Sequence, residues 1–257
     1  MIGRINEKYV LRRTPSFLSF APDANACVYD DTEHDKYPSR MYTFANPDEL
    51  VLDDALSSVY GYVSDGILRV IDIKTGRGRQ VHKGEYFSTK EAIALSGNAV
   101  GIAIERVGEQ VLNVFGGPIE SKGRLKYIDG CSDTLLIPPV KKGMSCFNHL
   151  HFPSGITQTM HTHPSVRAGI VASGYGTCTT PFGGLPLVQN SPFAILPRDD
   201  RADGRHCFIT SDSTMDVIAY HPDSDFGPTD ENHPMINRTI VDGVSAAQID
   251  SIRTEEI

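Results

Sequence analysis

Two histidines separated by one residue, His161 and His163, lie past the middle of the chain and are suited to binding a metal ion. In an extended strand alternate side chains project from the same face, so both imidazoles would point to one side. Imidazole is a good ligand for iron, zinc, nickel, copper and manganese. On a helix the same spacing would separate the two rings around the axis. We therefore expect an extended segment that supplies two nitrogen ligands to one ion.

Two glycines and an arginine flank this pair at regular distances. Five residues separate Gly155 from His161, three separate His163 from Arg167, and six separate Arg167 from Gly174. The spacing resembles the first motif of the cupin superfamily, which has a glutamate where this chain has Arg167. That glutamate is usually a metal ligand, whereas arginine stays protonated and offers only hydrogen-bond donors. The resemblance therefore implies a site with three histidine ligands.

The resemblance places the third histidine on a later strand, after a segment that ends near a proline. Residues 193–197 read as such a strand, and His206 follows a polar insert that is longer than in the family pattern. We predict His206 as the third ligand, with three nearby substitutes: Asp199, Asp200 and Asp203. The predicted cofactor is a divalent metal ion, with Fe(II) favoured and Zn, Mn or Ni as alternatives. The competing interpretation is that these histidines are surface or structural residues.

Arg167 has a predicted role of its own. In the cupin pattern its position points into the barrel cavity, where a guanidinium would bind a carboxylate or phosphate in a bidentate manner. A guanidinium beside a dication is unfavourable unless an anion lies between them. We therefore predict Arg167 as a catalytic-site residue that binds a small anionic substrate, whose other end reaches the metal. The alternative is an ion-pair residue far from any site.

Three histidine ligands leave coordination positions open for water, O₂ or a chelating substrate. Open sites of this kind suit Fe(II) oxygen chemistry, and three-histidine cupins resemble thiol dioxygenases and diketone-cleaving dioxygenases. The predicted function is therefore a non-haem Fe(II) dioxygenase that acts on a small carboxylate-bearing molecule. Two alternatives stay open: a Zn- or Mn-dependent isomerase or lyase, in which the metal only polarises a carbonyl, and a non-enzymatic small-molecule-binding cupin.

Composition limits the possible partners. The 257-residue chain has a formal net charge of −8, which argues against a nucleic-acid-binding surface. No apolar run approaches the ~20 residues that cross a bilayer, and the first residues lack an apolar signal core. The five cysteines are scattered without a CxxC pair, which favours reduced thiols. We expect a cytoplasmic protein with neither nucleic-acid nor membrane partners.

The sequence predicts that short strands position the candidate residues. Runs rich in β-branched residues, such as residues 67–73, recur between turns, which indicates strands. No long stretch has the 3.6-residue period of an amphipathic helix. The resemblance implies an all-β fold of two cupin-type barrels (double-stranded β-helix, or jelly roll), the first without a metal site. The expected divisions are an N-terminal arm (1–54), a degenerate barrel (55–120), a metal-binding barrel (121–222) and a tail with a short helix (223–257). Because cupins often pack sheet to sheet, we expect a homodimer in which the first half provides the contact.

A second His-x-His pair, His149 and His151, lies in the predicted strand 146–152. Leu150 and Phe152 form its apolar set and should face the barrel core. The two histidines should then face away, as surface or interface residues. Elsewhere, His34 and His82 are expected to be exposed, and neither His221 nor His233 is expected to be a ligand.

Overall fold

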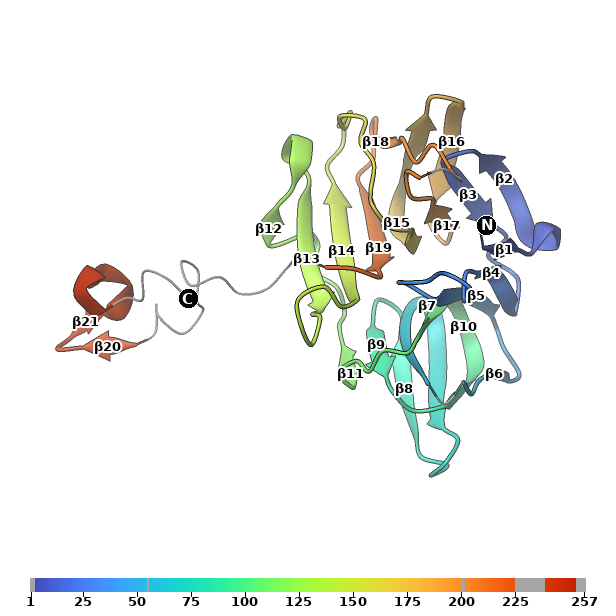
Figure 1. Ribbon diagram of the computed structural model, residues 1–257, viewed down its shortest axis with the longest axis horizontal. Coiled ribbons are helices and arrows are strands. Elements are labelled where there is room, and N and C mark those ends of the chain that lie inside the picture. Colours follow the sequence, from blue (N-terminus) through green and yellow to red (C-terminus); the bar gives the residue numbers. More distant parts are fainter. Residues whose placement is uncertain (1–2, 55, 200–201, 225–238, 253–257) are drawn as a thin grey trace.

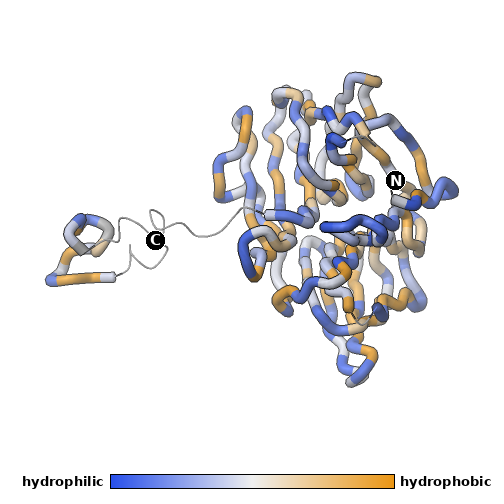
Figure 2. The backbone as a smooth tube through the Cα atoms, in the orientation of Figure 1, coloured by the Kyte–Doolittle hydropathy of each residue, from blue (hydrophilic) through white to orange (hydrophobic). Residues whose placement is uncertain are grey.

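The computed structural model describes residues 3–54, 56–199, 202–224 and 239–252. Strands in two large antiparallel sheets dominate these residues, and the two sheets lie one above the other (Figure 1). Apolar and polar residues are interspersed along the strands of both (Figure 2). The all-β prediction is confirmed. No helix in the described part of the chain is long and apolar enough to span a membrane.

The first sheet has nine strands in the spatial order β1-β4-β5-β10-β7-β9-β11, with β6 paired to β10 and β8 to β7. Their bounds are β1 (Arg4–Ile5), β4 (Ala26–Asp30), β5 (Ser39–Ala45), β6 (Leu50–Leu52), β7 (Ser57–Asp72), β8 (Gly78–His82), β9 (Tyr86–Thr89), β10 (Ile93–Val107) and β11 (Val114–Gly116). Residues 67–72 of the predicted strand 67–73 form the second part of β7, and residue 73 lies in the turn that follows.

The second sheet has ten strands in the order β12-β13-β14-β19-β15-β17-β3-β2, with β16 and β18 paired to β15. Their bounds are β2 (Val10–Thr14), β3 (Phe17–Phe20), β12 (Leu125–Lys126), β13 (Ser132–Ile137), β14 (Cys146–Phe152), β15 (Arg167–Thr180), β16 (Gly183–Val188), β17 (Pro192–Ile195), β18 (Cys207–Ile209) and β19 (Met215–His221). The central pair β15–β19 matches β7–β10 of the first sheet, and β17 matches β9.

Three apolar cores hold these sheets together. One lies inside the first half and includes Leu68 and Phe87. Another lies inside the second half and includes Phe152 and Phe193. The third joins strands of the two sheets, as the contact between the rings of Tyr60 and Phe147 shows. The two halves therefore pack sheet to sheet within one chain.

Residues 1–54, the predicted arm, are divided between both sheets. Strands β1 and β4–β6 belong to the first sheet, whereas β2 and β3 belong to the second, where β3 pairs with β17. In the predicted tail, residues 244–252 form β21 (Val244–Ser245), paired with β20 (Ile240–Val241), and two short 3₁₀ helices (Ala246–Gln248, Asp250–Ile252). Two more 3₁₀ helices cover Glu7–Tyr9 and Ile128–Gly130.

The second histidine pair faces away from its own barrel core, as predicted. Phe152 and Leu150 of β14 pack in the second-half core, so His149 and His151 project from the opposite face. That face is covered by the first half, and the side chain of His149 is fully buried. His149 Nε2 and His151 Nδ1 lie 2.9 and 2.8 Å from the same oxygen of Asp216. The pair is therefore an internal polar contact at the boundary of the two halves.

Candidate metal centre

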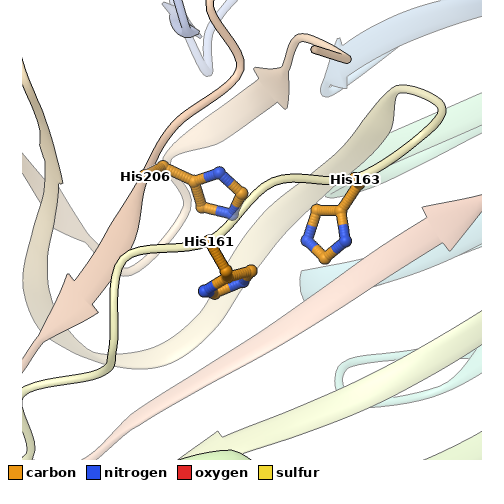
Figure 3. A group of neighbouring side chains, drawn as sticks. All are labelled: His161, His163 and His206. Carbon is orange, nitrogen blue, oxygen red and sulfur yellow. The ribbon is translucent and has the colours of Figure 1, made fainter.

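Three histidines from two segments converge at one point of the second half (Figure 3). Each of His161, His163 and His206 offers one ring nitrogen, and these nitrogens lie within 4.8 Å of one another. Backbone hydrogen bonds fix the two segments, because the amide of His161 donates to the carbonyl of His206 at 2.9 Å and the reverse bond measures 3.0 Å. It is the only group of this kind among the described residues. The three predicted ligands are thus brought together.

The segment that carries His161 and His163 is extended but is not a full strand. Only His161 forms a β-bridge, to His206, and β15 begins at Arg167. Proline at position 164 has no amide hydrogen to donate to a ladder, which explains why strand pairing does not continue through this segment. The expectation of a regular strand at this point is therefore corrected, although both rings still face the same cavity.

The hydrogen bonds of the rings leave nitrogens free for a metal. His206 Nδ1 lies 2.9 Å from the carbonyl oxygen of Gly204, and His161 Nδ1 lies 2.8 Å from that of Thr159. A carbonyl oxygen only accepts, so each Nδ1 carries the proton and each Nε2 keeps its lone pair. His206 Nε2 is buried and has no hydrogen-bond partner. A metal-ligating histidine shows this arrangement, in which a carbonyl orients the ring.

Burial keeps the rings of His163 and His206 neutral. It lowers the pKa of His206 to about 4, with a further lowering by the neighbouring charges of His161 and Arg167. Burial also lowers the pKa of His163 to about 2, and Arg167 and the other two histidines add to this effect. Since a metal binds the neutral form of imidazole, His163 and His206 are ready to bind one at pH 7. The residues present therefore fit a divalent ion with three nitrogen ligands.

Arg167 lies at the start of β15 and lines the same cavity. Its Nη1 is 2.9 Å from Asp223 Oδ1, and both side chains also contact the hydroxyl of Ser165. Its Nε is buried without a partner. The structure thus combines the two interpretations of Arg167, because one nitrogen forms an ion pair while the guanidinium still borders the cavity.

Two of the three carboxylates predicted as substitute ligands, Asp199 and Asp203, are not part of the histidine cluster. Asp203 pairs with Arg205, and Asp199 accepts a hydrogen bond from the amide of Ala202. Asp200 lies outside the described residues. His206 is therefore the ligand candidate that this insert contributes.

The cavity is small and has mostly apolar walls. Its volume is about 30 Å³, room for roughly two to three water-sized groups. Its apolar lining includes Leu150, Phe152, Phe193, Ile195, Phe208 and Val217, and its polar lining consists of the three histidines, Arg167, Gln158, Tyr127 and His221. His221, which sequence reasoning set aside, is therefore a wall of the site. Val217, Ala219 and His221 are alternate residues of β19 and therefore share one face of the strand. This spacing could have indicated that His221 faces inward.

The first half has apolar residues where the second half has its histidines. Leu52 of β6 pairs with Ile93 of β10, in the position where His161 bridges His206. Leu52 and Ile93 are 2% and 1% exposed and belong to the first-half core. Carbon side chains offer no ligand atoms, so this pair of positions cannot bind a metal.

Comparisons with known proteins bear on the fold. No protein-family model matches the sequence, and no curated protein matches it either. Among solved structures, a cupin 2 conserved barrel domain protein from Leptotrichia buccalis is similar over 81% of this chain and 90% of its own, with a TM-score of 0.54 and 13% identity. A putative glyoxylate-induced protein from Pseudomonas aeruginosa matches over 88% and 93%, with a TM-score of 0.54 and 12% identity.

A third similar structure is a mutant of salicylate 1,2-dioxygenase from Pseudoaminobacter salicylatoxidans. It matches over 81% of this chain and 71% of its own, with a TM-score of 0.50 and 6% identity. These likenesses concern architecture, and they agree with the two matching sheets. The chain therefore has the cupin fold, in the two-barrel arrangement of bicupins.

Proposed function

We propose that the protein is a metal-dependent cupin enzyme, a non-haem Fe(II) dioxygenase that acts on a small carboxylate-bearing molecule. The observation that carries this proposal is the cluster of His161, His163 and His206, in which the buried Nε2 of His206 has no partner. When bound, Fe(II) would supply O₂ activation at the coordination positions that three histidines leave open.

The other residues of the cavity have roles that fit such a reaction. Arg167 would bind the carboxylate and hold the substrate against the metal, with Asp223 and Ser165 keeping the guanidinium in place. Apolar walls such as Phe193 and Phe208 would exclude bulk water, which strengthens the attraction between the substrate anion and Arg167. The similarity to salicylate 1,2-dioxygenase is one of fold only, at 6% identity.

The test of this function begins with elemental analysis of protein purified without a chelating tag. We expect close to one equivalent of iron, and O₂ consumption when small carboxylates are added. Zinc or manganese without O₂ uptake would instead support the isomerase or lyase alternative. A protein that binds no metal at all would support a non-enzymatic binding module and overturn the proposal.

Arg167 gives a second test of the same proposal. In the Arg167→Ala variant we expect a raised KM for the carboxylate substrate and an unchanged metal content, because no guanidinium nitrogen can be a metal ligand. An Arg167→Lys variant keeps the charge but not the planar fork, so it should recover only part of the affinity. Loss of the metal in Arg167→Ala would contradict the role assigned to Arg167.

A further inference from the structure

A fourth imidazole, that of His221, faces the cavity from a different strand. His221 is the last residue of β19 and pairs with Cys146 of β14. Its side chain projects inward with those of Val217 and Ala219 and lines the cavity together with Arg167 and His163. Burial lowers the pKa of His221 well below its ordinary value, and the charges of Arg167 and His163 lower it further. The ring is therefore neutral and offers one N–H donor.

The ring nitrogens of His221 differ from those of the three clustered histidines. They are not part of the group that lies within 4.8 Å. Within the described part of the chain they also form no hydrogen bond, and the residue is half-buried at the end of its strand. The N–H of this cavity-lining ring is therefore available to donate a hydrogen bond to a ligand in the cavity.

Arg167 presents unused donors beside this ring. Its hydrogen bonds to described protein groups all come from Nη1, which contacts Asp223 and Ser165. Its Nε is buried without a partner, and the whole residue is only 8% exposed. The edge formed by Nε and Nη2 is the part of a guanidinium that binds a carboxylate through two parallel hydrogen bonds. Asp223 and Ser165 therefore hold the guanidinium by one nitrogen, and the donors of the other edge have no described protein partner.

We propose that His221 is a substrate-binding residue, which forms with the Nε–Nη2 edge of Arg167 a carboxylate subsite beside the three clustered histidines. This inference rests on the proposed function for the reaction itself, but it assigns a new residue and a specific hydrogen-bond pattern. The carboxylate would accept two hydrogen bonds from Arg167 and one from His221. The rest of a small substrate would then extend toward the metal.

Binding to zinc-loaded protein tests the subsite without turnover. The probes are acetate, glycolate and pyruvate, each compared with its neutral amide by isothermal titration calorimetry. We expect at least one acid to bind at least tenfold more tightly than its amide. In His221→Phe, which keeps a ring but removes the donor, the affinity for that acid should fall roughly tenfold, as for a hydrogen bond to a charged group. His221→Gln supplies an N–H donor again and should recover part of the loss.

Control measurements separate this role from a structural one. His82 is exposed on the first half, so His82→Phe should leave the carboxylate affinity unchanged. Metal content must stay at the wild-type level in both His221 variants, because loss of the metal would make His221 a ligand or a structural residue. An unchanged carboxylate affinity in His221→Phe would also overturn the proposal.

The wild-type protein provides a test that does not depend on folding of a variant. Addition of the bound acid should shift the ¹⁵N signals of the His221 ring and of Arg167 Nε, and the absence of both shifts would overturn the subsite. The same titration on metal-free protein distinguishes the two proposals. Carboxylate binding by a protein that takes up no metal would leave the subsite intact and remove the enzyme function.

Discussion

At the scale of single residues, the neutral state of the buried histidines has a measurable consequence. Burial lowers the pKa of His206 to about 4 and that of His163 to about 2. Neither ring therefore has a proton to release when a metal binds at pH 7. Calorimetric titration of zinc into metal-free protein, in buffers of different ionisation enthalpy, should show no proton release from these two residues. A release of two or more protons would contradict the described environment of the rings.

The same shifts predict how the metal-free protein responds to acid. A histidine with a lowered pKa binds fewer protons when folded than when unfolded, so stability is fully present above the unfolded pKa of about 6.5 and declines below it. The decline continues to about pH 4 for His206 and to about pH 2 for His163. Between pH 7.5 and 5, urea unfolding should show a loss of about 2 kcal/mol for each ring. His206→Gln should lose less over this interval, and equal slopes in the two proteins would refute the assignment.

The spacing of His161 and His163 indicated one pair of candidate ligands, and the resemblance to the cupin motifs pointed to His206; the structure brings the three rings together. Residue types and spacing were not enough for His221, whose inward orientation depends on the register of β19 beside β14 and β15. They also did not show that Asp223, distant in sequence, would hold Arg167 by one nitrogen. Contacts of this kind arise from tertiary packing and leave no local pattern.

At the scale of strands, close packing at Gly169 fixes β15 against its neighbours. A Cβ atom at this position would lie 2.2 Å from the carbonyl oxygen of Ile218 and 3.0 Å from the ring of Phe193. The backbone of β19 cannot move away without breaking its pairing to β15, so Gly169→Ala should lower the free energy of unfolding by about 1–3 kcal/mol. Urea denaturation measures this loss.

Gly184 provides the matched control for that substitution. It lies in β16 and is exposed, and a Cβ there would meet two side chains and no backbone, Thr177 at 3.0 Å and Thr179 at 3.8 Å. Gly184→Ala should therefore change the stability by less than about 0.5 kcal/mol. A similar loss in both variants would mean that the effect at Gly169 is not one of packing against β19.

The strand pattern predicted an all-β chain but not the place of its first strands. Strand β3 (residues 17–20) is short and mostly apolar. Its local sequence does not indicate which strand edge it pairs with. In the structure β3 pairs with β17, and the ring of Phe17 stacks on that of Phe193 at 5.5 Å. Because this partner lies about 175 residues away along the chain, no short-range signal indicates the pairing.

At the scale of the whole molecule, the sheet face expected to form a homodimer is used inside the chain. Tyr60 and Ile102 of the first half belong to the same buried core as Ile218 and Tyr220 of the second. Polar contacts also cross this boundary, since the Tyr60 hydroxyl lies 2.8 Å from the Ser145 hydroxyl and that of Tyr220 lies 3.0 Å from Ser39. A homodimer, which stays a prediction, would therefore have to use another surface.

The shared core predicts that the two halves unfold together. Separation would expose the apolar residues of that core, at a cost of about 25 cal/mol for each Å² of apolar surface, so neither half should persist when the other unfolds. The chain contains no tryptophan, so a single introduced tryptophan reports on one half. Phe115→Trp marks the first half and Phe182→Trp the second, both at exposed positions. The two variants should give one common midpoint in urea, measured by fluorescence.

Metal binding provides a second test of common unfolding, because the proposed ligands lie only in the second half. A ligand that binds only the folded state stabilises every part of the protein that unfolds together with the binding site. Added zinc should therefore raise the midpoint reported by Phe115→Trp as much as that reported by Phe182→Trp, although the first half contributes no metal ligand. A shift confined to the Phe182→Trp reporter would show two independent folding units and would contradict a core shared between the barrels.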